Sequence, residues 1–518
     1  MKTLFRTSLL AITLLLTCCA RETPKIHIIG GTTVGETDPN TTQTCGWGQL
    51  LGQFVPEGVV VINHAKPSCS SLSFYRDGYW DEVRNQISPG DYVLIQFAHD
   101  DERCAHADCK GANSPQTGFR DNISNFVDET RQSGGIPILV QPIVRRLFEN
   151  NVISRRGTHN FSRNANDTDM DYTAVIRNLA DSLGVDVIDL CTKSKQIVEA
   201  YGTVGSKEQL FVEADNTNTS TKGAALFAIA VAETLDTMNI WNGQLKKPTI
   251  VSAQRPINLG DVFVGDTAWQ IIDLVNVEGI STRRILNHQK QMTIVAPSGF
   301  KLMRTPGGEL KDTLMFFTNA TVQAVLTYAP ASASPNIGEL EVRTANSTSK
   351  ILVQGNGVLA KQKGQTTVDW HGTPNTVDNQ PIQLKLSAIR GLELTQEGIR
   401  PIGDVWSSDP NPFEYVQFKL TNKSQSLRIT EISIESSASQ SYKLACSLGN
   451  DFFRNLTIGQ RVAKDDTDNS LCRETFKTSF HIRSGQTMLF RLYLASASTS
   501  LAKPFLLSEI KLKMETFE

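Results

Sequence analysis

The stretch IHIIGGTTVGE, Ile26 to Glu36, decides how the first part of the chain is interpreted. An apolar run ends in a glycine pair and two threonines, so a buried strand is expected to carry a small hydroxyl residue to its own tip. A hydroxyl in that place is a candidate nucleophile. The question that the stretch raises is whether Thr32 acts as one or stands where one used to be.

From residue 25 to about residue 240, short apolar runs alternate with helical patterns. Five runs rich in β-branched residues lack polar alternation, which is typical of parallel strands buried on both faces: residues 25–30, 59–65, 92–99, 136–143 and 185–190. Predicted helices lie between or after them, at residues 46–54, 118–134, 170–184 and 221–238. The repetition predicts a three-layer α/β domain, whose ligand residues gather beyond the carboxyl ends of the strands.

The rest of the 518 residues is rich in strand patterns. Residues 247–360 contain apolar runs separated by Gly, Pro and Asn, which predicts a β-sandwich. A polar linker follows, and the region 366–518 shows period-two alternation, so we expect a second β-sandwich there. The predicted divisions are therefore 1–19, 22–243, 247–360 and 366–518.

The first 19 residues have the pattern of a targeting segment. Lys2 and Arg6 precede a short apolar run from Leu9 to Leu16, which is too short to span a membrane. The run ends in LLLTCCA, which resembles a bacterial lipoprotein signal with Cys18 or Cys19 as the lipidated residue; a plain cleaved signal peptide is the alternative. We expect a protein of the bacterial cell envelope, lipid-anchored or periplasmic or extracellular. A net charge of -2 without a dense basic block gives no reason to expect nucleic acid as a partner.

An exported chain can form disulfides. Cys104 and Cys109 are the easiest local pair, and Cys446 and Cys472 are a candidate pair in the C-terminal region. A zinc site built from Cys104, His106 and Cys109 would lack the second ligand pair of a structural site, so no metal or cofactor is expected.

Four segments of the first domain carry a family resemblance: GWGQLL, INHAKPSCSSLSF, WDEVRNQISPGDYVLIQFAHDD and EADNTNTSTKGAALFA. Their order and spacing resemble the SGNH (GDSL-type) hydrolases, and most of all the rhamnogalacturonan acetylesterase branch. The resemblance implies a flavodoxin-like fold with an open site that removes acetyl groups from polysaccharides. It covers nearly all of residues 25–240. The region 247–360 resembles Ig-like domains of the choice-of-anchor type.

The resemblance also places a catalytic triad on this chain. The family reads Gly-Asp-Ser-Thr where this chain has Gly30, Gly31, Thr32 and Thr33, so Thr32 takes the nucleophile position. The family's Asp-x-x-His begins here at Asp215, but the position of the base is Asn218. An amide has no useful basicity near neutral pH, so Thr32 lacks its expected activating partner.

The oxyanion-hole positions differ from the family as well. Ser68 replaces a glycine whose N–H donates to the oxyanion, a mild change unless the backbone angle requires glycine. Asp100 replaces the asparagine whose side chain donates, and an ionised carboxylate offers no hydrogen. His99 precedes Asp100 at a predicted strand end, so we expect these two side chains to point apart.

Three functions stay open at this point. The substituted positions favour a catalytically degenerate envelope protein that binds a pectic or acetylated polysaccharide through the former cleft and the β domains. The alternative is an active carbohydrate acetylesterase with Thr32 as an unusual nucleophile, helped by Asp215, Asp100 or a distant histidine. A non-enzymatic scaffold is the third.

Overall fold

A computed structural model describes most of the chain. The described residues are 24–38, 42–106, 114–164, 166–212, 215–241, 243–282, 289–305, 308–359, 361–371, 377–379, 382–390, 392–395, 398–401, 415–423, 426–437, 441–448, 461–468, 471–482, 487–495 and 505–517. The predicted targeting segment, with Cys18 and Cys19, lies outside them. None of the described helices is long and apolar enough to cross a membrane.

A parallel sheet of five strands organises the first domain. Its order is β2 (Val61–Asn63), β1 (Ile26–Gly30), β3 (Tyr92–Gln96), β4 (Ile136–Val140) and β7 (Asp186–Ile188), and every neighbouring pair is parallel. Each predicted strand run therefore contains a strand, and β1, β3 and β4 are almost wholly buried. The order 2-1-3-4-5 is that of flavodoxin-like folds, in which the ligand site lies beyond the carboxyl ends of the strands near β1 and β3.

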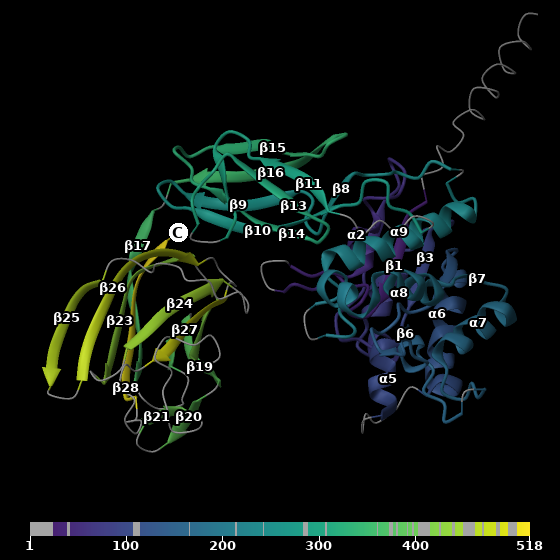
Figure 1. Cartoon of the computed structure of the whole chain (residues 1–518), viewed down its shortest axis with the longest axis horizontal. Helices are drawn as coiled ribbons and strands as arrows, with labels where there is room; N and C mark the ends of the chain where they lie inside the picture. Colours follow the sequence, from purple (N-terminus) through teal and green to yellow (C-terminus); the bar gives the residue numbers. More distant parts are fainter. Residues whose placement is uncertain are drawn as a thin grey trace, which may run out of the picture. The chain divides into compact units, whose positions relative to one another are not determined.

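Helices cover both faces of this sheet, which gives the three layers expected (Figure 1). On one face α3 (Ser71–Arg76), α4 (Tyr79–Arg84), α6 (Arg120–Gln132) and α7 (Tyr172–Leu183) share a core with the strands, which includes Phe74, Trp80, Phe97 and Phe126. The other face carries α2 (Trp47–Leu51), α8 (Leu190–Gln209) and α9 (Thr221–Thr237), and α9 contacts both α2 and α8.

Two of these features differ from the sequence-based expectation. The long helix α8 was not predicted, because its apolar pattern is weak and Gly202 interrupts it with φ 69°, outside the helical region. The predicted strand end at residues 97–99 also differs. The strand β3 stops at Gln96, and α5 (His99–His106) begins three residues later.

The remainder of the chain forms two all-β sandwiches. In the first, a sheet of order β12-β14-β10-β8 accompanies one of order β13-β11-β15-β16-β9. The bounds of these strands are β8 Ile250–Ser252, β9 Ile257–Phe263, β10 Ala268–Asn276, β11 Lys290–Val295, β12 Phe300–Met303, β13 Thr313–Thr318, β14 Val322–Tyr328, β15 Pro335–Arg343 and β16 Thr348–Val358.

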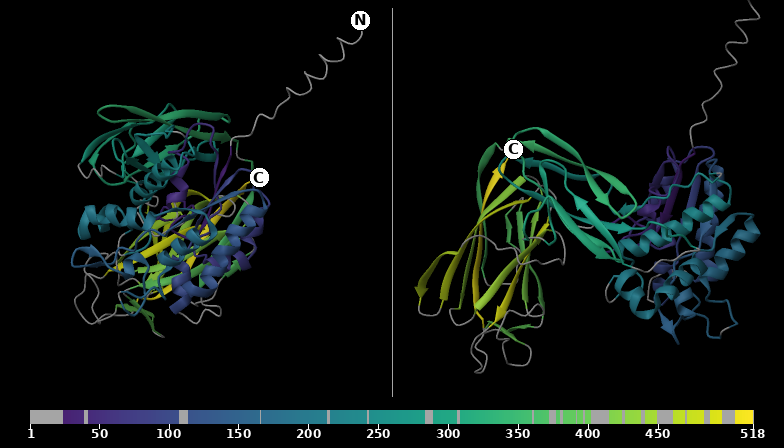
Figure 2. Two further views of the ribbon diagram at one scale, coloured as in Figure 1. Left: turned by 90° about the vertical axis from the view of Figure 1, so that its right-hand side faces the viewer. Right: turned by 45° about the horizontal axis from the view of Figure 1, so that its top comes forward.

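The second sandwich has two five-stranded sheets, β17-β28-β23-β26-β25 and β18-β19-β22-β27-β24, whose long strands face each other (Figure 2). Side chains from both sheets enter one hydrophobic core that includes Trp370, Phe418 and Ile432. The strands are β17 Gln362–His371, β18 Val377–Asn379, β19 Ile382–Arg390, β22 Tyr415–Asn422, β23 Ser426–Ser437, β24 Ser441–Leu448, β25 Arg461–Asp468, β26 Leu471–Ile482, β27 Thr487–Ala495 and β28 Leu507–Phe517.

The chain divides into two compact units, the α/β domain and the pair of sandwiches. Residues 277–282 belong to the α/β unit, where the Thr282 N–H donates to Glu233 of α9 at 3.0 Å. In the first expected disulfide, the side chains of both Cys104 and Cys109 lie outside the described part of the chain. In the second, the side chain of Cys446 does. They stay predictions.

Candidate active site

The loops at the carboxyl edge of the parallel sheet enclose a cavity of about 780 Å³. All five positions that the family pattern assigns to catalysis line it: Thr32, Ser68, Asp100, Asp215 and Asn218. Thr32 follows β1, Ser68 lies beyond β2 and Asp100 beyond β3, as the topology of a parallel sheet requires. Asp215 and Asn218 come from the loop before α9, which a backbone bridge between Phe211 and Thr219 closes.

The hydroxyl of Thr32 is a hydrogen-bond acceptor within the loops. The Ser68 backbone N–H donates to Thr32 Oγ1 at 2.8 Å. The N–H that the family resemblance assigns to the oxyanion hole is therefore directed at the Thr32 hydroxyl. The neighbouring Thr33 is buried and receives a hydrogen bond from Gln96 Nε2 at 3.1 Å. The Gln96 carboxamide oxygen in turn accepts from the Trp47 indole at 2.7 Å, which anchors the tip of β1 in the core.

The carboxylate of Asp100 occupies the place of the expected asparagine donor. It accepts a hydrogen bond from the Thr32 backbone N–H, and its side chain is 14% exposed. Burial raises the pKa of Asp100 above its usual value, while the charges of Arg103 and Arg145 act against that rise. A cavity position that should stabilise developing negative charge therefore already holds an acidic group.

The loss of the family's aspartate at Gly31 fits this arrangement sterically. A Cβ atom at Gly31 would lie 2.8 Å from Asp100 Oδ2 and 2.8 Å from the Cys69 carbonyl oxygen. Both contacts are shorter than van der Waals distance, so a larger residue at position 31 requires Asp100 or the loop to move. The substitutions at positions 31 and 100 thus depend on each other.

Two positions where the family has glycine keep a positive φ without it. Ser68 has φ 63° and Ala98 has φ 138°. Side chains with a Cβ atom are disfavoured in this region, by about 1 kcal/mol or more. The loops thus hold a backbone conformation that glycine would suit better at both positions.

The two positions that the family resemblance assigns to the acid and the base of the triad form a hydrogen-bonded turn. Asp215 accepts from the backbone N–H groups of Thr217 at 2.6 Å and Asn218 at 3.0 Å, and from Asn218 Nδ2 at 2.6 Å. The amide therefore occupies the position in which a histidine would be oriented by Asp215. It donates to the carboxylate, and it has no basic nitrogen to offer to Thr32.

A buried network that the sequence interpretation missed supports these loops. Arg145, which follows β4, donates to Glu102 Oε2 and the His99 carbonyl oxygen, both at 2.9 Å, and also to Thr217 Oγ1. Glu102 is 2% exposed and also bonds to His159. The position of Arg145 just after a predicted strand is the signal that could have marked it as a site residue.

None of the described imidazole side chains forms a hydrogen bond with the Thr32 hydroxyl. His99 is buried beside His159, with its Nδ1 atom 3.5 Å from Thr33 Oγ1, and burial lowers its pKa well below the usual value. His99 and Asp100 both line the cavity. α5 begins at His99, so the strand alternation on which the expectation that they point apart was based does not apply there. The side chain of His106 lies outside the described part.

The remaining candidate histidines are occupied elsewhere. His159 Nε2 lies 2.6 Å from the Ile143 carbonyl oxygen. His64 Nε2 lies 3.0 Å from His27 Nδ1, and His27 Nε2 lies 3.3 Å from Asp91 Oδ2. Burial lowers the pKa of His64 to about 4, so it is neutral at pH 7. These imidazoles belong to structural networks.

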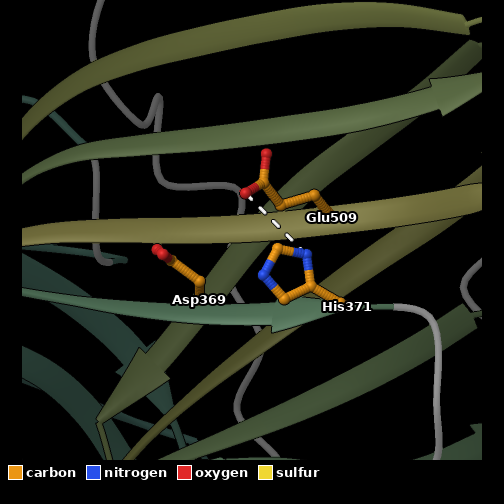
Figure 3. A group of neighbouring side chains, drawn as sticks. All are labelled: Asp369, His371 and Glu509. Carbon is orange, nitrogen blue, oxygen red and sulfur yellow. Dashed lines mark ion pairs between the residues drawn. The ribbon is translucent and has the colours of Figure 1, made fainter.

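Outside the cleft, one group of described residues has metal-ligand chemistry. Asp369 and His371 of β17 and Glu509 of β28 have ligand atoms within 4.8 Å of one another (Figure 3). Each carboxylate already has a cationic partner, because Lys511 Nζ lies 3.2 Å from Asp369 Oδ2 and Arg473 Nη2 lies 2.8 Å from Glu509 Oε2. We interpret the group as an ion-pair network on the face of the sheet.

Comparison with known proteins agrees with this geometry. Over 229 residues the chain is 34% identical to rhamnogalacturonan acetylesterase RhgT of Bacillus subtilis, an alignment that covers 42% of this chain and 91% of that protein. The chain belongs to the rhamnogalacturonan acetylesterase family. A rhamnogalacturonan acetylesterase of Emericella nidulans is 27% identical over 220 residues, covering 40% of this chain and 82% of the relative. Both alignments leave more than half of this chain outside the family region.

The chain was also compared with solved structures. The acetylxylan esterase Axe2 of Geobacillus stearothermophilus is 15% identical, with a TM-score of 0.31, and covers 44% of this chain and 100% of its own. No family model matches the chain. The α/β domain of this rhamnogalacturonan acetylesterase family member is an SGNH-type hydrolase fold, and two all-β sandwiches follow it.

Proposed function

We propose that this family member has lost ester hydrolysis and binds acetylated pectic polysaccharide in the former catalytic cleft. One observation carries the proposal: the Ser68 N–H, which the family resemblance assigns to the oxyanion hole, and the neighbouring Thr32 N–H are both used inside the protein. The Thr32 N–H donates to Asp100, and the Ser68 N–H donates to Thr32 Oγ1. Oxyanion stabilisation requires donors aimed at the charge that develops on the substrate, and losing one costs roughly two to three orders of magnitude in rate.

The polar side chains of the cleft suit binding. Thr32, Ser68, Asp100, Asp215 and Asn218 bring hydroxyl, carboxylate and amide groups to one cavity. Such groups exchange hydrogen bonds with sugar hydroxyls and acetyl carbonyls without any bond being broken. The names of the curated relatives supply the ligand class, rhamnogalacturonan with O-acetyl groups.

Acetate release distinguishes this proposal from an active enzyme. We expect the wild type and Thr32→Ala to release acetate from p-nitrophenyl acetate and from acetylated pectin at the same rate as buffer. A wild-type rate above that of Thr32→Ala contradicts the proposal. In the binding arm, we expect acetylated rhamnogalacturonan oligosaccharides to raise the Tm of the full chain, and an unchanged Tm favours the scaffold hypothesis.

An active acetylesterase with Thr32 as nucleophile is the second candidate. The observation in its favour is the raised pKa of Asp100, since a protonated carboxyl can donate a hydrogen bond to an oxyanion. This candidate predicts that acetate release falls as the pH rises and Asp100 ionises. It also predicts that Thr32→Ala abolishes the activity, which the same assay measures.

We further propose that the chain is anchored in the bacterial envelope through Cys18 or Cys19, and that the first sandwich is an Ig-like spacer or binding module. The support is the pattern of the first 19 residues and the strand-rich run that resembles choice-of-anchor domains. Palmitate labelling of the full-length chain in a bacterial host is expected to disappear in one of Cys18→Ala and Cys19→Ala. If the wild type and both single variants all remain unlabelled, the proposed lipid anchor is contradicted.

A further inference from the structure

A second cavity of about 460 Å³ adjoins the former catalytic cleft. The two cavities share Leu147 and Asn216 as walls. The remaining lining consists of residues from the segment after β4 and from α8: Arg146, Phe148, Glu149, Ser154, Arg156 and Thr203. A polymer bound in the cleft can therefore place a neighbouring unit in this second cavity.

Arg146 is a partly desolvated cation at the boundary of the two cavities. Its backbone N–H donates to the Asn216 carbonyl oxygen at 2.7 Å, and its Nη2 donates to Asn216 Oδ1 at 2.6 Å. Its buried Nε has no hydrogen-bond partner. Burial lowers the pKa of Arg146, with only the charge of Asp215 acting against it, and no described carboxylate forms an ion pair with the guanidinium. A partly buried cation without a full counter-charge is stabilised by an anion that binds beside it.

Arg156 contributes a second cation to the same cavity. Its guanidinium lies over the ring of Phe161, 5.9 Å from the centroid, and Phe161 lines the catalytic cleft. In the described part of the chain its side chain has no ion pair, so the guanidinium edge is available to a ligand. Glu149 is the one acidic residue in this lining, which leaves an excess of positive charge.

We infer that the second cavity is a carboxylate subsite, in which Arg146 and Arg156 bind the carboxylate of a uronic acid unit of the polysaccharide. The inference rests on the proposed function, because it takes the glycan in the adjoining cleft as given. Guanidinium groups match the planar carboxylate and form charge-assisted hydrogen bonds with it. The cleft then binds the acetyl-bearing part of the polymer, and this subsite binds a carboxylate of the same polymer.

Isothermal titration calorimetry on the full chain tests the subsite. The two probes are an acetylated rhamnogalacturonan oligosaccharide and the same oligosaccharide with its carboxyl groups reduced to primary alcohols. We expect the wild type to bind the acidic form roughly tenfold more tightly at low salt, a preference that shrinks as salt rises. Arg156→Gln should remove most of that preference and leave binding of the reduced form unchanged. Arg146→Gln should also remove most of the preference, and it should weaken binding of both forms to the extent that Asn216 moves.

Arg120→Gln is the matched control, because Arg120 is an exposed arginine of the same unit that lines neither cavity. Arg156→Gln is the decisive variant, since Arg146 also holds Asn216 and its replacement can disturb the cleft. Equal wild-type affinity for both probes overturns the subsite and leaves the proposed function standing. Binding of neither probe overturns both. A charge preference that survives in Arg156→Gln and Arg146→Gln alike places the carboxylate elsewhere and overturns the subsite.

Discussion

The parallel sheet and the loops at its carboxyl edge have departed from the family pattern to very different extents. The sheet has the 2-1-3-4-5 order of flavodoxin-like folds, and its strands β1, β3 and β4 are almost wholly buried. The loops hold positive φ at Ser68 and Ala98, and they carry side chains that differ from those that the family resemblance predicts for catalysis. We expect loop geometry and loop chemistry to be separable in this fold.

The separation has a physical basis in groups that lie beneath the loops. Asp101 is buried and accepts from the Ser71 backbone N–H at 3.0 Å and from its hydroxyl at 2.6 Å, which links α5 to α3. Arg145 joins the segment after β3 to the turn at Thr217. These contacts do not involve the oxyanion or the nucleophile, so catalytic side chains can change without collapse of the cleft.

Restoring the catalytic side chains tests this separation most strongly. If the loops keep catalytic geometry, the quadruple variant Thr32→Ser, Ser68→Gly, Asp100→Asn and Asn218→His should gain acetate release by about a thousandfold or more over the wild type. p-Nitrophenyl acetate hydrolysis measures the gain. The matched control carries the first three changes with Asn218→Ala, lacks a base and should stay inactive. A folded quadruple variant without activity would show that the loops have moved beyond catalytic geometry.

The network of Glu102, Arg145 and His159 should matter for the stability of the α/β domain. Glu102→Gln leaves buried Arg145 and His159 without their charged partner, and we expect the free energy of unfolding to fall by about 3 kcal/mol. Urea unfolding followed by circular dichroism measures it. Glu82→Gln is the control, since Glu82 is exposed on α4 and should change stability by less than about 0.5 kcal/mol. If Glu102→Gln and Glu82→Gln change the free energy of unfolding equally, Glu102 does not support the loops.

The smallest effect is expected at the positions where glycine is missing. Ala98→Gly relieves an unfavourable φ of 138°, and after the entropy cost of glycine in the unfolded chain we expect a gain of about 0.5 kcal/mol. Gly30→Ala is the opposite control, because its Cβ would lie 2.5 Å from the Gln96 carbonyl oxygen and should destabilise the domain. The same urea unfolding measures both. If Ala98→Gly destabilises the domain, the packing of the Ala98 methyl group contributes more free energy than its positive φ costs.

Much of the site could be predicted from the sequence, because the carboxyl ends of parallel strands lie side by side at one edge of the sheet. Thr32, Ser68 and Asp100 follow three predicted strands, and they line one cavity. Arg145 and Glu102 were missed, since a charged residue in a loop has no periodic signal and its buried partner lies 43 residues away. His99 was misplaced because the helix start at α5 overrode the strand pattern before it.

The sequence alone determined the α/β class and the order of the α/β and β-rich regions, because hydrophobic periodicity and block spacing are local properties. That the catalytic positions are substituted stays a prediction from the family resemblance. Only the tertiary structure decided which contacts the residues at those positions make. Whether the Thr32 hydroxyl is available, whether Asp100 faces the Thr32 N–H, and whether Gly31 leaves room for it depend on contacts between loops about 36 to 69 residues apart. Such contacts arise from the packing of strands and loops in space, and a linear pattern does not encode their geometry.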